Sequence, residues 1–400
     1  MNILKKQNPI IPILLGIIPF FTDICIKNTQ FVNILYIFIC LFIFVQFRFY
    51  FKFFKCNFVV LTLSLFFLYT VFSSVIHCLF TDLSFPFEKV IHFFCMLLVL
   101  YCFTVMNAKS NCIFWKIAYF ISATYAFVVL IQTLSLNITG RFVSFLEISQ
   151  ENRPAAFYTE PAHYSMIMFW IVFSILFNVD NLTISKKKRI IFSLIISFSV
   201  LMSTSSSGTV YICLCWIWFA LFKCNFKIIS KLVFLIVLFI ALYLIFCFSE
   251  LFQSSIDHLL TLDFSSINSG GFRIARGFDF FCSLAQFDKI FGYGLGNTQN
   301  YISSLNFISI YDNYGTINSS WVSALSEILL DGGYISFISI FLLCIKKTLK
   351  SDVTLKLLFF LFFILIFSNE VLYTPQIYYV LCIIITYEHK MLHNIKAKAK

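Results

Sequence analysis

The chain has 400 residues, of which 60% are hydrophobic and only 12% are charged, and its mean hydropathy is +0.92. Soluble domains contain about 45–50% apolar and about 25% charged residues, so this chain has too little polar surface to dissolve in water. Its net charge of +11 comes mostly from short Lys/Arg clusters between apolar runs, a pattern typical of cytoplasmic loops in membrane proteins. The composition therefore excludes a soluble enzyme, argues against nucleic-acid binding and predicts a polytopic membrane protein.

Apolar segments long enough to cross a bilayer recur along the whole chain. A bilayer core of about 30 Å requires about 20 apolar residues in a helix, and on this basis we predict about twelve spans. They lie at residues 9–26, 31–47, 58–80, 88–106, 113–134, 161–178, 190–206, 208–222, 232–249, 319–345, 354–370 and 372–388. The last span is weak because Asn369 and Glu370 precede it, so eleven spans are the alternative. The predicted fold is an all-α membrane helix bundle that forms a single domain over residues 1–400.

The distribution of positive charge predicts the orientation of these spans. With both termini in the cytoplasm, all but seven of the 29 Lys and Arg residues lie on the cytoplasmic side. This orientation places a first loop, residues 135–160, and a large loop, residues 250–317, in the periplasm. The large loop contains many Phe, Ile and Leu residues, so we expect a folded extracytoplasmic site there rather than a disordered tether.

The first loop ends in a stretch that combines basic, acidic and imidazole side chains, starting at Arg153. Thr159 is a candidate N-cap and Pro161 is tolerated in a first helical turn, so Glu160 would lie at a helix N-terminus. His163 follows three residues later on the same face, and the carboxylate and imidazole could orient or deprotonate a hydroxyl group. The alternative is that Glu160 only caps the helix and that His163 anchors it at the membrane interface.

The large loop contains two arginines, Arg273 and Arg276, whose spacing puts both guanidinium groups on one helical face. A guanidinium presents a rigid fork of donors that matches phosphate oxygens, so two of them suit a pyrophosphate. The alternative is a surface pair that binds lipid headgroups or Asp279. We favour a functional site because these are two of only four arginines on the predicted outer side, together with Arg141 and Arg153.

A glycine-rich run follows in the same loop, and its alternating glycines would let backbone N–H groups approach an anionic or sugar ligand closely. The candidate binding residues of this run are Gly292, Gly294, Gly296 and Asn297. Asn318 opens the next span, and Glu327 lies further inside it. A carboxylate facing lipid would cost about 2.5–3.5 kcal/mol, so Glu327 is expected to face the bundle interior.

In their order along the chain, these segments resemble the O-antigen polymerase (Wzy) and O-antigen ligase group of membrane glycosyltransferases. The stretch from Arg153 to Pro161 resembles the group's Arg…Gly/Ala…Glu-Pro segment, with Ala156 where a Gly is common. Residues 203–208 resemble a Ser/Thr-rich hairpin that follows it, which either satisfies its own backbone or offers hydroxyls to a sugar.

The later segments carry the rest of the resemblance, which covers about residues 150–340. Arg273 and Arg276 with the glycine-rich run resemble the large-loop arginine and its "pxxGxGxG" partner. Asn318 and Glu327 resemble the segment that opens the next span, where the ligases usually have a His in place of Asn318. That difference favours a polymerase over a ligase.

The resemblance implies a GT-C-like glycosyltransferase in the bacterial inner membrane, with its active site facing the periplasm. It would transfer an undecaprenyl-diphosphate-linked glycan chain onto a lipid-linked repeat unit of O-antigen or capsule. Arg273 and Arg276, with Arg153, would stabilise the leaving diphosphate. Glu160 would orient or deprotonate the acceptor hydroxyl, with His163 as the second candidate.

The alternatives are an O-antigen ligase, which uses lipid A-core as acceptor, a lipid-linked oligosaccharide flippase, and an assembly subunit of the polysaccharide machinery. A flippase usually has two related halves and short outer loops, which this sequence lacks. We expect no cofactor, because the sequence has no acidic pair suited to a divalent metal and the reaction needs no nucleotide sugar. The expected partners are the lipid-linked oligosaccharide, membrane lipid and a chain-length-regulating co-polymerase, with no nucleic acid.

Overall fold

In a computed structural model of the chain, the described residues are 58–80, 85–109, 112–143, 154–158, 161–179, 182–223, 270–297, 322–349 and 352–368, with scattered positions at 13–14, 16–17, 20, 236, 240, 377, 380–385 and 387–388. Throughout these segments the regular structure is α-helix and no strand occurs, so the described part of the chain is all-α as predicted. The chain divides into two compact units, Met1–Ile43 with Met106–Asp257, and Phe44–Val105 with His258–Lys400. Each unit is described by itself.

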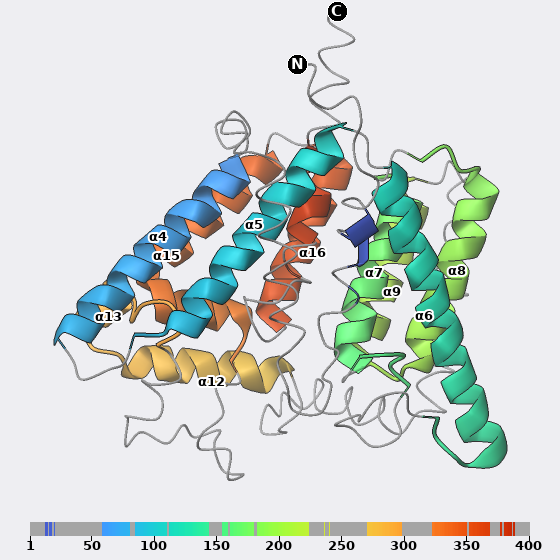
Figure 1. The fold of residues 1–400 in the computed structure, drawn as a ribbon, viewed down its shortest axis with the longest axis horizontal. Helices are drawn as coiled ribbons and strands as arrows, with labels where there is room; N and C mark the ends of the chain where they lie inside the picture. The colour runs from blue at the N-terminus through green and yellow to red at the C-terminus, as the bar shows by residue number, and fades with distance from the viewer. Residues whose placement is uncertain are drawn as a thin grey trace, which may run out of the picture. The chain divides into compact units, whose positions relative to one another are not determined.

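The first unit is a helix bundle built around α7. Its described helices are α6 (Cys112–Thr139), α7 (Pro161–Leu176), α8 (Lys186–Met202) and α9 (Ser206–Phe222). Nearly every side chain of α7 is buried, because α6, α8 and α9 all pack against it (Figure 1). A helix that is apolar all round, as α7 is, needs such an enclosed position.

Two contacts fix the ends of α7. Near its start, Gly208 of α9 lies so close that a Cβ on it would be 2.2 Å from the Cβ of Ser165. At its end, the buried guanidinium of Arg189 donates to the carbonyl oxygens of Ile175, at 3.0 Å, and Leu182, at 2.6 Å. A cation there also interacts favourably with the negative end of the helix dipole.

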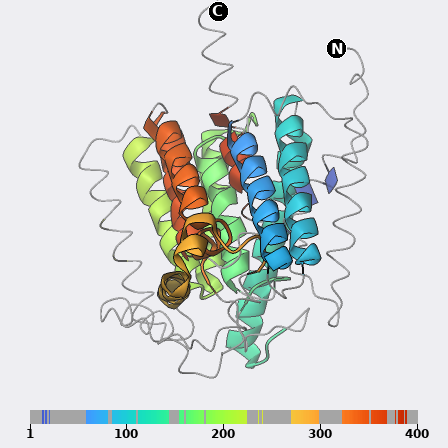
Figure 2. The ribbon, with the colours of Figure 1, turned by 90° about the vertical axis from the view of Figure 1, so that its left-hand side faces the viewer.

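The second unit is built around α15. Its described helices are α4 (Phe58–Phe80), α5 (Phe87–Lys109, to Val105), α12 (Gly270–Ser283), α13 (Gln286–Phe291), α15 (Ala324–Leu349) and α16 (Val353–Ser368). Helix α15 packs against α4, α12, α13 and α16. Helix α12 lies across α15 and α16 instead of running alongside them, and it is seen end-on in Figure 2. Helix α15 has a break inside it at Gly333, where φ is 62° and ψ is −167°.

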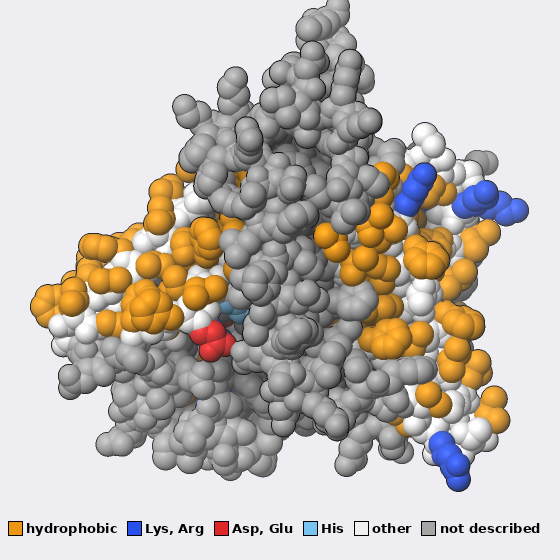
Figure 3. Space-filling model, viewed as in Figure 1, with side chains coloured by type: hydrophobic (Ala, Val, Ile, Leu, Met, Phe, Trp, Pro, Cys, Tyr) orange, Lys and Arg blue, Asp and Glu red, His pale blue; other side chains and the backbone are white. Residues whose placement is uncertain are grey.

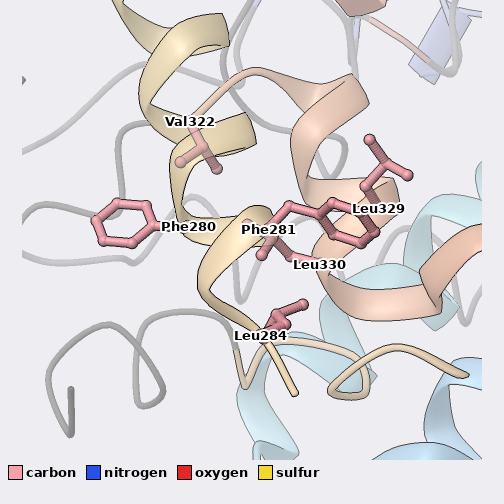
Figure 4. Close-up of a cluster of buried hydrophobic side chains, with 6 residues drawn as sticks. All are labelled: Phe280, Phe281, Leu284, Val322, Leu329 and Leu330. Atoms are coloured by element: carbon pink, nitrogen blue, oxygen red, sulfur yellow. The ribbon is translucent and has the colours of Figure 1, made fainter. Parts of the chain in front are cut away.

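A cluster of buried apolar side chains joins α12 to α15. It consists of Phe280, Phe281, Leu284, Val322, Leu329 and Leu330 (Figure 4). Gly277 lets the two helices approach closely, since a Cβ there would lie 2.2 Å from the Cβ of Ser326. Tyr293, in the glycine-rich run, packs against the same cluster. Helix α12, helix α15 and the glycine-rich run therefore share one core.

The apolar helices indicate a membrane protein. Among the described residues, three helical segments are long and apolar enough to cross a bilayer: Val59–Phe80, Ile113–Thr139 and Ala324–Leu342. Shorter apolar helices occupy Pro161–Leu176, Ser207–Phe222 and Val353–Ile366. Hydrophobic side chains dominate the described surface in Figure 3, as expected where a surface faces lipid instead of water.

The predicted spans agree with the described helices in part. Eight of the ranges coincide with helices, with differences at their ends: α6 continues to Thr139, beyond the predicted end at 134, and α15 begins only at Ala324. The predicted large loop contains α12 and α13 in its described part, so that part is folded as expected. The spans at 9–26, 31–47 and 232–249 lie mostly or wholly outside the described residues, and the span at 372–388 lies partly outside them, so twelve spans and their orientation stay predictions.

Candidate functional site

The described residues hold most, but not all, of the predicted site. Arg153, Glu160 and Asn318 lie outside them, and Arg273 lies in the first turn of α12 with its side chain not described. His163 is a partly buried residue in the first turn of α7, in the first unit. The second unit brings the others together: Arg276, Gly292, Gly294, Gly296, Asn297 and Glu327.

The glycine-rich loop, defined here as residues 291–297, lies between α4 and α15. The N–H of Tyr293 donates to the carbonyl of Leu330 at 2.7 Å, and the N–H of Gly294 donates to the carbonyl of Asp331 at 2.9 Å. Both carbonyls belong to the helical turn before the break at Gly333, where the regular backbone pattern of α15 is interrupted. The loop thus supplies donors to a helix at the point where that helix is broken.

The glycines of this loop allow its backbone to touch both helices. Gly294 has φ +90°, and a Cβ on it would lie 2.4 Å from the backbone nitrogen of Ser74 in α4. A Cβ on Gly292 would lie 2.4 Å from the carbonyl oxygen of Asp331 in α15. The N–H groups of these glycines donate to oxygens within the chain, so close helix packing is the reason the structure gives for glycine here. Their role in ligand binding stays a prediction.

Helix α4 holds the other side of the loop with a stripe of polar side chains. Tyr69 Oη donates to the carbonyl of Phe291 at 2.8 Å, and Ser73 Oγ donates to the carbonyl of Gly292 at 3.1 Å. His77 Nε2 lies 3.2 Å from that same Gly292 oxygen. The sequence analysis missed these residues, although their i, i+4, i+8 spacing inside an apolar span is a signal that could have found them.

His77 also contacts an acid and an aromatic ring. Its Nε2 lies 3.5 Å from Oδ1 of Asp288 in α13, and its ring stacks on Tyr293 with centroids 4.5 Å apart. Partial burial raises the pKa of the Asp288 carboxyl above its ordinary value, and the nearby His77 acts in the opposite direction. The contact was not predicted, because His77 lies far along the chain from Asp288 and Tyr293.

Two buried polar side chains close the far end of the loop. Asp331 is fully buried, and its Oδ2 accepts from the N–H of Gly296 at 3.3 Å. Asn297 is also fully buried, and its Nδ2 donates to the carbonyl of Tyr293 at 3.2 Å. Within the described residues, Oδ1 of Asn297 has no hydrogen-bond partner. Leaving such an acceptor unpaired costs about 1–3 kcal/mol, so this atom is suited to meet a donor from outside the loop.

Arg276 is a fully buried cation of the predicted site. Its side chain has 0% exposure, and its guanidinium carbon lies 5.1 Å from the ring centroid of Phe280. A cation–π contact of this kind offsets part of the cost of taking a charge out of water. Glu327 lies in the first turn of α15, the helix against which α12 packs, and is partly buried.

In the first unit, Gln132 of α6 holds the segment that precedes α7. Its Oε1 accepts from the N–H groups of Ala155, at 3.2 Å, and Ala156, at 3.0 Å. Its Nε2 donates to the carbonyl oxygens of Ala156 and Val143, both at 3.2 Å. Ala156 has φ 54°, a conformation that favours glycine, at the position where the resembling group commonly has Gly. Gln132 was not predicted, because a single buried amide leaves no pattern in the sequence.

Part of the predicted helix start and the serine-rich hairpin are described. The described part of α7 begins at Pro161, the first residue of a predicted span, whereas the predicted N-cap Thr159 and Glu160 lie outside the described residues. In the hairpin, Ser203 Oγ donates to the carbonyl of Val200 at 2.7 Å, and Ser205 Oγ accepts from the N–H of Gly208 at 3.2 Å. These hydroxyls satisfy backbone groups, which supports the first of the two interpretations of this segment.

Neither a scan against protein-family models nor a search of curated proteins found a match for the sequence. Within the described residues there is also no group of three or more His, Cys, Asp or Glu side chains that could hold a metal ion.

Proposed function

We propose that this protein is a polysaccharide polymerase of the bacterial inner membrane. It transfers a glycan chain from undecaprenyl diphosphate onto a lipid-linked repeat unit at the periplasmic face. The observation that carries the proposal is the fully buried Arg276 on α12, which shares a core with the glycine-rich loop and with the start of α15. Taking a guanidinium out of water is costly, and a diphosphate bound beside it would offset that cost.

The first part of the reaction is the departure of the diphosphate. As the bond between the anomeric carbon and the phosphate oxygen breaks, the electron pair stays on the diphosphate and its negative charge grows. Arg276, with Arg273 on the same helical face and Arg153, stabilises this charge. Donors held in a site of low dielectric constant are worth more than in water, and the loss of one costs about 10²–10³ in rate in comparable sites.

The second part is attack by the acceptor. A hydroxyl oxygen of the repeat unit forms the new bond to the anomeric carbon, and its proton passes to the carboxylate of Glu160. His163 lies in the first turn of α7, directly after the predicted position of Glu160, and is the second candidate for this proton. The acceptor lipid then carries the lengthened chain, and undecaprenyl diphosphate is released.

The test is a gel of surface polysaccharide from a strain that lacks the protein, complemented with the wild type or with variants. Arg276→Ala and Glu160→Gln should leave lipid A-core capped with a single repeat unit and no ladder. Arg276→Lys keeps the charge but not the fork of donors, so it should give a weak ladder. Arg141→Ala is the matched control, because Arg141 is an exposed arginine on the same predicted side, and it should restore the ladder.

Two results would overturn the proposal, provided that membrane blots show equal amounts of each variant. A bare core with accumulated lipid-linked polymer in the null strain would identify a ligase instead. A full ladder from both Arg276→Ala and Glu160→Gln would show that neither residue takes part in the reaction.

A further inference from the structure

The junction between α4 and the glycine-rich loop contains a histidine whose protonation is constrained by its neighbours. Two oxygens lie close to His77 Nε2: the carbonyl oxygen of Gly292, at 3.2 Å, and Oδ1 of Asp288, at 3.5 Å. A carbonyl oxygen can only accept a hydrogen bond. Nε2 of His77 must therefore carry a proton, whether the ring is neutral or charged.

The stacked ring of Tyr293 restricts how His77 can turn. Its centroid lies 4.5 Å from that of His77, with an angle of 24° between the ring planes. Tyr293 is itself held by the bond from its N–H to Leu330 in α15. The glycine-rich loop therefore contacts the imidazole twice. The Tyr293 ring stacks on its face, and the Gly292 carbonyl meets Nε2 at its edge.

We propose that His77 is a positioning residue: with Asp288 it clamps the glycine-rich loop onto α4. Its Nε2–H donates to the carbonyl of Gly292, and Oδ1 of Asp288 lies beside the same nitrogen. Removal of the imidazole would leave the loop with fewer bonds to α4, so the loop would open more often.

The link between this clamp and the glycan transfer rests on the proposed function. Tyr293 packs against the apolar cluster that includes Phe280, the residue over which the Arg276 guanidinium lies. A loop that opens would loosen this cluster and, with it, the placement of Arg276. His77 would then act on the reaction through the loop, without touching the substrate.

The experiment measures hydrogen exchange of the peptide covering residues 288–297, in the purified full chain in nanodiscs. His77→Gln keeps an N–H donor at this position, so its protection should stay near that of the wild type.

Two further variants complete the test. His77→Leu removes the donor and should speed exchange about tenfold. Tyr69→Phe is the matched reference: it removes another single bond from α4 to the same loop, so exchange should rise there as well. Wild-type protection in His77→Leu, or exchange in His77→Gln as fast as in His77→Leu, would overturn the clamp.

The polysaccharide ladder gives the second measurement. His77→Leu should weaken the ladder, and His77→Gln should restore most of it. If the exchange results hold but no variant in the chain affects polysaccharide, the clamp stands and the proposed function fails. If exchange is unchanged by His77→Leu, the clamp fails whatever the ladder shows.

Discussion

Substitution of Gly294 by Ala tests how the glycine-rich loop is packed. The backbone of Gly294 has φ +90°, and a Cβ on it would lie 2.4 Å from the nitrogen, and 2.5 Å from the Cα, of Ser74. Both atoms belong to the backbone of α4, so no side-chain rotation can make room. The loop would have to move away from α4, and the bonds that Tyr69 and Ser73 make to it would be stretched.

The expected cost has two parts. Holding a residue with a Cβ in a left-handed conformation costs about 1–2 kcal/mol. Overpacking against a rigid neighbour adds about 1–3 kcal/mol. Gly294→Ala should therefore destabilise the protein by about 2–5 kcal/mol, apart from a gain of about 0.4–1 kcal/mol from the stiffer unfolded chain.

Gly140→Ala separates these two parts. Gly140 follows the end of α6 with φ +64°, and a Cβ there would meet nothing within 4 Å. Only the conformational cost applies, so its destabilisation should be about 0.5–1.5 kcal/mol. Thermal unfolding of both variants in the same detergent, with the wild type, provides the comparison. Equal losses of stability in the two variants would refute the close packing of the loop on α4.

Three other predictions follow from the described contacts. Ala156→Gly should stabilise the protein by up to about 1 kcal/mol in thermal unfolding, because it relieves a left-handed conformation at φ 54°; a loss of stability would contradict this. Arg189→Met should cost about 1.5–3 kcal/mol, since it removes the guanidinium bonds to the carbonyl groups of Ile175 and Leu182 and leaves them only their backbone donors; unchanged thermal unfolding would contradict this. For Asp288 the raised pKa means that the folded state holds the proton more tightly than the unfolded state, so wild-type stability should fall relative to Asp288→Asn as pH rises from about 4 through the raised value. A difference between these two proteins that stays flat over that range would refute the shift.

The sequence predicted the elements that depend on local patterns. Helix α4 has the predicted bounds, residues 58–80, because a continuous apolar run with polar flanks defines its length. Pro161 begins α7 because its fixed φ suits a first turn and its missing N–H costs nothing there. Such features depend on residues within a few positions of one another.

The parts that sequence could not predict depend on distant partners. His77 and Ser73 contact Gly292, which lies 215 and 219 residues away in the sequence. Hydropathy averaged over an apolar span also does not reveal the polar side chains within it. The Gly332-Gly333 pair alone does not predict the break in α15 at Gly333, because a helix can contain glycine and still keep its backbone hydrogen bonds. Only the donors from the loop show why the break is stable here.

The contacts between α4 and the glycine-rich loop also constrain how the protein is made. Ser73 leaves the ribosome 219 residues before Gly292, which at about 5–20 residues per second is a delay of about 10 to 45 seconds. The first unit is contributed largely by the residues between them, so most of it is synthesised while the polar stripe of α4 still awaits its acceptors. During that interval these hydroxyls and the imidazole need other partners, since unpaired polar groups are costly in hydrocarbon. Nascent α4 is thus a helix on which a membrane insertase or chaperone can act until the second half of the chain arrives.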